Sequence, residues 1–248
     1  MSTLSSRAKS INKEFTEHKR ARGETNIEWL SSHWRDDRVA LLLLGGTGLV
    51  DFRLRVAQSH LRNDLTPSHW SHVVLMGQGE AKDLATTPVY EISLMPAEGF
   101  GFPPASNGVQ KTVLGRYADT KNFPNIAILY LPASVAPKQL MDALERFQQQ
   151  RIVLDAVQLL VAWLAYVWGA GRAGNPLLDG MGIPSSAMLE TVTGAEGFDL
   201  TPGLESRASC PEAIWQSARW WHDYHKENKE GRLRVHFARR ITCRLEDT

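Results

Sequence analysis

The residue pair best suited to chemistry in this chain is a cysteine that stands directly before a proline. In Ser209-Cys210-Pro211-Glu212 the proline starts a helical pattern, and proline is favoured in the first turn of a helix. Cys210 therefore falls at a helix N-terminus, where unpaired N–H groups and the helix dipole favour negative charge. A thiol placed there ionises more readily, and the thiolate is the nucleophile. The pattern predicts a reactive Cys210. The alternative is a small buried side chain, the usual state of a free cysteine.

A catalytic thiolate also needs a base that takes its proton and a third group that orients the base. His72 is the candidate base, because it begins the apolar run His72–Gly77, which is typical of a buried strand. Glu91 lies in the next predicted strand, Pro88–Leu94, and alternation lets its carboxylate face the imidazole. A structural histidine and an exposed strand glutamate are the alternatives, and both stay open at this point.

Three segments together resemble the circularly permuted papain-like cysteine hydrolases, relatives of the NlpC-type amidases and of lecithin:retinol acyltransferase. They are Trp70-Ser71-His72-Val73, the strand that holds Glu91, and the downstream Cys210-Pro211-Glu212. In the permuted group the histidine strand precedes the cysteine helix, as it does here. The resemblance implies an α+β, permuted papain-like fold, in which an antiparallel sheet packs against helices and the nucleophile lies at a helix N-terminus. It implies Cys210 as nucleophile, His72 as general base and Glu91 as orienting acid.

Two features depart from the pattern of that group. Pro211 stands where a small polar residue often follows the cysteine, and a helix-like insert, Val50–Leu61, precedes the histidine strand. A nearby polar side chain such as His69 is the next candidate for the third role.

The function that the resemblance implies is hydrolysis of an amide bond in a peptide or peptide-like substrate. The first alternative is a thiol-dependent lipid acyltransferase or phospholipase, since the same site handles acyl esters. The second is a catalytically inactive binding module with a papain-like fold. We predict no cofactor and no metal site. His222 and His225, three positions apart, could share a metal, but no third ligand has suitable spacing and charged neighbours favour a solvated helix face.

Composition limits the protein class. The chain is 43% hydrophobic and 22% charged, which is ordinary for a globular protein with a full core. A net charge of +1 gives no electrostatic footprint for nucleic acid. Two cysteines make no disulfide framework, and Met1–Arg22 lacks the apolar centre of a secretory signal, so we predict a cytoplasmic location. The oligomeric state stays open.

Without linkers or repeats, residues 1–248 are predicted to form one domain, with an N-terminal helical extension at 1–31 and a catalytic core at 39–246. The mostly apolar segment Ile152–Trp168 contains Asp155 and Gln158, which are costly in a bilayer, so it is predicted to be a buried helix and not a membrane span. Further predicted strands and helices follow from periodicity and from proline and glycine positions. The strands are 39–44, 109–114, 126–131 and 233–246, the last with Cys243 on its apolar face, and the helices are 137–150, 185–193 and one that begins at 210.

Overall fold

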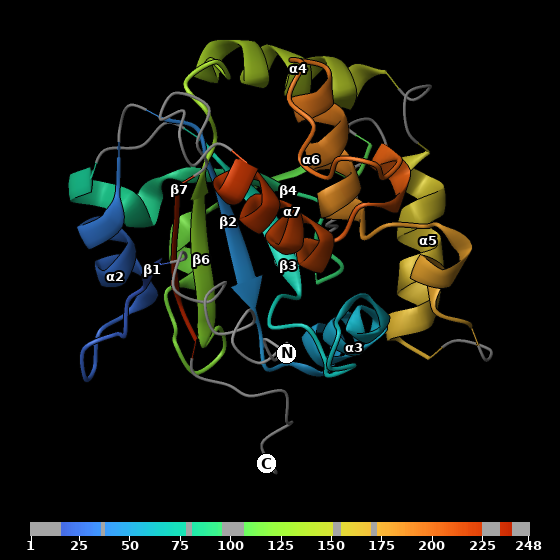
Figure 1. The fold of residues 1–248 in the computed structure, drawn as a ribbon, viewed down its shortest axis with the longest axis horizontal. Coiled ribbons are helices and arrows are strands. Elements are labelled where there is room, and N and C mark those ends of the chain that lie inside the picture. The colour runs from blue at the N-terminus through green and yellow to red at the C-terminus, as the bar shows by residue number, and fades with distance from the viewer. Residues whose placement is uncertain are drawn as a thin grey trace, which may run out of the picture.

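The computed structural model describes residues 16–35, 38–77, 81–95, 107–150, 155–169, 173–224 and 234–239. Within these residues the chain is α+β, with one central sheet and helices on both faces (Figure 1). The strands follow the order β1-β7-β6-β2-β3-β4-β5 across the sheet. Their bounds are β1 (Thr16–Glu17), β2 (Ala40–Gly45), β3 (His72–Met76), β4 (Pro88–Glu91), β5 (Gln110–Val113), β6 (Asn125–Tyr130) and β7 (Arg234–Ala238).

Neighbouring strands are antiparallel except β1, a two-residue strand that runs parallel to β7. The predicted strands at 39–44, 72–77, 88–94, 109–114 and 126–131 therefore exist, and β3 and β4 pair as antiparallel neighbours. The last predicted strand, 233–246, is described only as β7. Cys243 lies outside the described residues.

Each face of the sheet carries its own apolar cluster. The α-helices are α2 (Asn26–His33), α3 (Leu49–Ala57), α4 (Pro137–Gln149), α5 (Ala156–Val167), α6 (Pro184–Gly194) and α7 (Pro211–Tyr224). Buried residues of α3 to α7 form the helical-face cluster, together with the odd-numbered residues of β2 and β3. The opposite-face cluster is formed by the even-numbered residues of β2 and β3. They pack with residues of α2 and of the 3₁₀ segments Ala81–Thr86 and Leu114–Tyr117. The alternation of a strand thus assigns its neighbouring residues to two different environments.

The sequence supplies the helix starts. Pro137, Pro184 and Pro211 each lie in the first turn of their helix, where a missing N–H is no loss. In α2 the Thr25 side chain and Glu28 form a capping box, which satisfies backbone N–H groups on both sides.

The capped start of α2 corrects the prediction of a helical extension over residues 1–31. Residues 16–17 are a strand, and the helix begins only at Asn26. Gly23 has φ of +83°, a left-handed conformation that interrupts a helix, and the Thr25 cap fixes the start two residues later. Residues 1–15 lie outside the described part of the chain.

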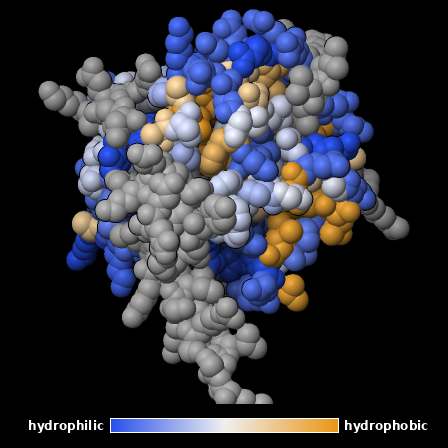
Figure 2. Space-filling view, turned by 45° about the horizontal axis from the view of Figure 1, so that its top comes forward, coloured by the Kyte–Doolittle hydropathy of each residue, from blue (hydrophilic) through white to orange (hydrophobic). Residues whose placement is uncertain are grey.

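The segment that resembled a membrane span is helix α5, twelve residues long. Asp155 caps it by accepting a hydrogen bond from the backbone N–H of Gln158 at 2.9 Å. One side of α5 is buried, and Val157 and Val161 are exposed on the other. Figure 2 shows apolar surface toward the right, the side on which α5 lies in Figure 1, and a further apolar area in the upper middle. Among the described helices, none is both long and apolar enough to cross a bilayer.

Candidate active site

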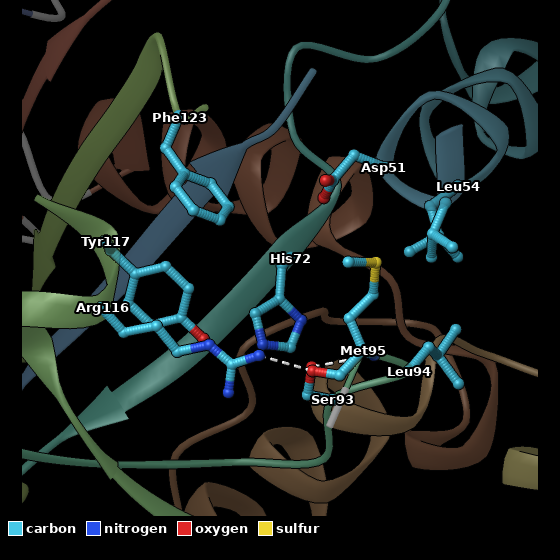
Figure 3. Close-up of a pocket in the computed structure, with 10 residues that line it drawn as sticks. Asp51, Leu54, His72, Ser93, Leu94, Met95, Arg116, Tyr117 and Phe123 are labelled. Atoms are coloured by element: carbon cyan, nitrogen blue, oxygen red, sulfur yellow. Dashed lines mark hydrogen bonds between the residues drawn. The ribbon is translucent and has the colours of Figure 1, made fainter. Parts of the chain in front are cut away.

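His72 is the first residue of β3, and its ring faces a pocket at the end of the sheet (Figure 3). His72 is paired with Leu44 of the neighbouring strand β2, and paired residues point to the same face of a sheet. Because Leu44 belongs to the opposite-face cluster, the side chain of His72 lies on that face. The pocket is lined half by apolar and half by polar side chains. The lining residues are Val50, Asp51, Leu54, His72, Ser93, Leu94, Met95, Arg116, Tyr117 and Phe123.

The imidazole of His72 is hydrogen-bonded through Nε2 to the carboxylate of Glu91, the last residue of β4. The same carboxylate oxygen accepts a hydrogen bond from the Tyr117 hydroxyl at 2.5 Å. Since an ionised carboxylate can only accept hydrogen bonds, Nε2 carries the proton and Nδ1 keeps a lone pair. The pair thus fixes one tautomer of His72, with Nδ1 free to take a proton.

The charge of Glu91 is stabilised although the side chain is fully buried. Burial alone opposes the charge, but the hydrogen bond from His72, the positive charge that His72 carries when protonated, the Tyr117 hydroxyl and the nearby Arg116 outweigh it. The pKa of Glu91 therefore lies below its ordinary value. Burial and the neighbouring Glu91 hold the pKa of Tyr117 well above its usual range, so the hydroxyl keeps its proton and remains a donor.

Arg116 and Asp51 bring two further charges to the pocket. Nη2 of Arg116 donates to the carbonyl of Met95 at 2.6 Å (Figure 3), and Nη1 lies 4.0 Å from Glu91 and makes no hydrogen bond with any described residue. Asp51 accepts a hydrogen bond from the Ser71 hydroxyl at 2.6 Å. Burial raises the pKa of Asp51, against the hydrogen bond from Ser71 and the positive charge that His72 carries when protonated.

Cys210 is not part of this pocket. It belongs to the helical-face cluster, whereas His72 points to the other face of the sheet. The close approach of Gly182 to the backbone of Ser209 fixes this position: a Cβ on Gly182 would lie 2.2 Å from the Ser209 carbonyl oxygen. The structure therefore brings together His72 and Glu91 and leaves Cys210 in a separate environment.

The environment of Cys210 also corrects the prediction of an ionised, partly exposed thiol. Its side chain has no exposed surface. Burial raises the pKa of the thiol to about 12, although the backbone N–H groups of Ala213 and Glu212 act in the opposite direction. Cys210 does lie directly before α7, as predicted, but desolvation outweighs the helix N-terminus.

The start of α7 is nevertheless anchored to the segment that leads into β3. Glu212 accepts a hydrogen bond from the Ser68 hydroxyl at 2.6 Å, and its backbone N–H donates to Gln58 at 2.8 Å. The rings of Trp70 and Trp215 lie 5.0 Å apart. The cysteine helix therefore contacts residues that precede the histidine strand, whereas thiol and imidazole, which were predicted to meet, lie on different faces of the sheet.

The other histidines singled out from the sequence lie outside the pocket of His72 or outside the described residues. His69 does not line the pocket; its carbonyl accepts a hydrogen bond from Asn125 and its ring lies edge-on to Trp70. His222 is buried on α7, and His225 lies outside the described residues.

Three charged or hydrogen-bonded residues close to His72 and Glu91, namely Asp51, Arg116 and Tyr117, are among the pocket residues that the sequence did not reveal. Tyr117 and Arg116 belong to a short 3₁₀ segment after β5, which has no periodic signal. Asp51 belongs to the helix-like insert that departs from the papain-like pattern, and that insert is α3, which forms one wall of the pocket.

Comparison with known proteins leaves the family open. The chain matches no protein-family model, no curated protein and no solved structure. The resemblance to permuted papain-like hydrolases therefore rests on the sequence segments themselves, and the geometry of the pocket is what bears on function.

Proposed function

We propose that the chain is a hydrolase of acyl bonds, amide or ester, in which His72 is the general base and Glu91 orients it. The observation that carries this proposal is the buried contact from Glu91 to Nε2 of His72, which leaves Nδ1 as a proton acceptor beside a pocket. A positioned histidine base of this kind contributes about 10²–10⁴-fold to a rate.

In the proposed reaction Nδ1 of His72 takes a proton from a water molecule as that water attacks the carbonyl carbon. The imidazolium that forms is stabilised by the Glu91 carboxylate. It then returns the proton to the leaving nitrogen or oxygen as the acyl bond breaks. The positive charge of Arg116, which lines the same pocket, would stabilise the oxyanion that develops on the carbonyl oxygen.

The pocket wall suggests the substrate. Val50, Leu54, Leu94, Met95 and Phe123 offer an apolar surface next to the polar group around His72. Such a pocket suits an apolar acyl group whose carbonyl lies at the imidazole. Both substrate classes predicted from the sequence, peptide-like amides and acyl lipids, contain such a group.

The proposal is tested with the full chain on two substrate series, acyl esters of increasing chain length and peptide amides with apolar residues, with products read by mass spectrometry. His72→Ala should lower kcat/KM by at least about 100-fold, and Glu91→Gln should lower kcat by a smaller factor. His60→Ala is the matched control, because His60 is exposed and outside the pocket. Thermal unfolding of each variant checks that it folds. Equal turnover by His72→Ala and wild type would reject the role of His72.

A second candidate is the thiol mechanism of the permuted papain-like hydrolases, with Cys210 as nucleophile. The observation in its favour is the anchoring of α7 to the segment before His72 through Glu212 and Ser68. It requires a rearrangement that brings the buried thiol to the imidazole. Cys210→Ala separates the two: turnover should be kept if water is the nucleophile and lost if the thiol is. Trapping of an acyl group on Cys210, seen by mass spectrometry, would establish the thiol route.

A further inference from the structure

Three histidines from distant parts of the chain meet at the β1 edge of the sheet, away from the pocket of His72. His18 directly follows β1, His33 ends α2 and His236 lies within β7. Figure 1 shows β1, α2 and β7 beside one another on the left. Each histidine is half-buried, and one ring nitrogen from each lies within 4.8 Å of the other two. We call these residues the histidine cluster.

The hydrogen bonds of His33 leave it ready to act as a metal ligand. Its Nδ1 lies 2.7 Å from the carbonyl oxygen of Trp29. A carbonyl oxygen only accepts, so Nδ1 carries the proton and Nε2 keeps its lone pair. A ring nitrogen bonded to a backbone carbonyl is the usual outer partner of a metal-bound histidine, because it fixes both tautomer and ring orientation.

His18 and His236 already have the spacing of two ligands on one ion. Nε2 of His18 and Nδ1 of His236 are 3.1 Å apart. Two nitrogens that each lie about 2.0–2.1 Å from a tetrahedral Zn²⁺ are separated by about 3.3 Å. In the metal-free protein the two nitrogens share one proton, and a metal ion would replace that proton. The third nitrogen lies within 4.8 Å of these two, so a shift of up to about 1.5 Å, within the reach of a side-chain rotation, brings it to the ligand separation of about 3.3 Å.

We propose that His18, His33 and His236 bind one divalent first-row transition-metal ion, with Zn²⁺ as its natural occupant. Imidazole suits Zn²⁺, Cu²⁺ and Ni²⁺, and three histidine ligands leave one position of a tetrahedral ion for water. The site is independent of the acyl hydrolase proposed above and uses none of its residues.

The metal would reinforce the short pairing of β1 with β7. β1 is paired with β7 through two residues, and the His18 backbone N–H donates to Phe237 at 2.8 Å. His18 and His236 are 218 positions apart in sequence. An ion that joins them to His33 ties the start of the described chain to the last strand and to α2.

The experiment uses the full chain, stripped with a chelator and then titrated with ZnCl₂ and, separately, CoCl₂. Wild type should bind one Zn²⁺ that survives dialysis, and Co²⁺ should give the visible absorption of a four-coordinate ion. His236→Ala, His18→Ala and His33→Ala should each weaken Zn²⁺ binding by at least about 100-fold, since even outer-shell partners of metal ligands are worth about 10–100-fold. His60→Ala, an exposed histidine elsewhere, is the matched control.

Thermal unfolding gives a second readout that does not depend on activity. Zn²⁺ at about 100 times its Kd should raise the Tm of wild type and of His60→Ala by about 5–10 °C and leave that of His236→Ala unchanged. Hydrogen exchange at the His18 amide should slow when Zn²⁺ is added to wild type. The proposal is overturned if wild type binds no Zn²⁺, or if His236→Ala binds it equally well. The proposal is likewise overturned if the Tm of wild type does not change with Zn²⁺. The histidine cluster would then be a packing contact that binds no metal.

Discussion

The Ser68 hydroxyl donates a hydrogen bond of 2.6 Å to the buried carboxylate of Glu212, and this contact joins α7 to the segment that leads into β3. Gln216 also donates to that carboxylate at 3.0 Å, and Arg62 lies 3.7 Å from it. A buried carboxylate needs such partners, because its desolvation is costly without them. The contact therefore matters both for stability and for the position of Cys210.

Ser68→Ala should lower the free energy of unfolding by about 1–3 kcal/mol, because it removes a donor and leaves a buried charge undersatisfied. Urea unfolding followed by circular dichroism measures this change. Ser206→Ala, at an exposed serine before α7, is the control and should change stability by less than about 0.5 kcal/mol. An equal effect of both variants would show that the Glu212 contact contributes nothing.

The thiol of Cys210 should be protected in the folded protein. Its pKa of about 12 leaves almost no thiolate at neutral pH, and its side chain is fully buried. In a Cys243→Ser background, which leaves one of the two cysteines, iodoacetamide at pH 7.5 should label Cys210 only at the rate at which the protein opens. Urea should make labelling fast. Rapid labelling of the folded protein would contradict the burial of this thiol and favour the thiol mechanism.

The buried Glu190 of α6 should make stability depend on pH. Burial, and after it the nearby Asp199, raise the pKa of Glu190 to about 7, although Thr201 and the Leu200 N–H donate to its carboxylate. A carboxyl with a raised folded-state pKa binds its proton more tightly when folded. The contribution of Glu190 to the free energy of unfolding is therefore largest below pH 4.5. This contribution is lost as pH rises toward 7, and the loss amounts to up to about 3 kcal/mol.

Glu190→Gln should flatten this dependence, since the amide does not titrate. Urea unfolding at a series of pH values between 4.5 and 8 measures the slope. Glu145→Gln, at an exposed position of α4, should keep the wild-type slope. If Glu190→Gln keeps that slope as well, another group is responsible.

The local pattern of the sequence was enough to predict most strands of the sheet. It was also enough to predict that His72 and Glu91 lie on the same face. A run such as Leu41–Leu44 is apolar throughout because β2 lies in mid-sheet and is buried on both faces. Alternation within two neighbouring antiparallel strands places His72 and Glu91 on one side, because both residues are local to that pair of strands.

The partner of Cys210 could not be predicted in the same way. A proline start fixes where α7 begins but not which face of the sheet it covers, since that depends on contacts with the segment before α6 and the segment before β3. The charged pattern before residue 31 likewise favoured a helix, and the pairing of Thr16–Glu17 with β7, more than 200 positions away, overrides it. Long-range pairing of this kind leaves no local signal.

The hydroxyl of Tyr117 gives the most specific test of how Glu91 is held in the site. It donates to the same carboxylate oxygen as His72, at 2.5 Å, and lowers the pKa of Glu91 after the contribution of His72. A hydrogen bond to a charged group is worth about 1.5–3 kcal/mol, so Tyr117→Phe should lower kcat about 10–100-fold if Glu91 orients the base.

Tyr117→Phe should also make the folded protein more sensitive to acid. Glu91 has a lowered pKa in the folded protein, so its carboxylate contributes stability that is lost as pH falls through that pKa. Without the hydroxyl the pKa of Glu91 rises toward its ordinary value, and this loss of stability begins at a higher pH. Tyr90→Phe is the matched control, because Tyr90 precedes Glu91 in β4 and lies on the other face of the sheet. Urea unfolding of wild type and both variants from pH 3 to 7 gives the result. A loss of stability in Tyr117→Phe that is the same at every pH would mean that the hydroxyl packs the site without holding the charge of Glu91.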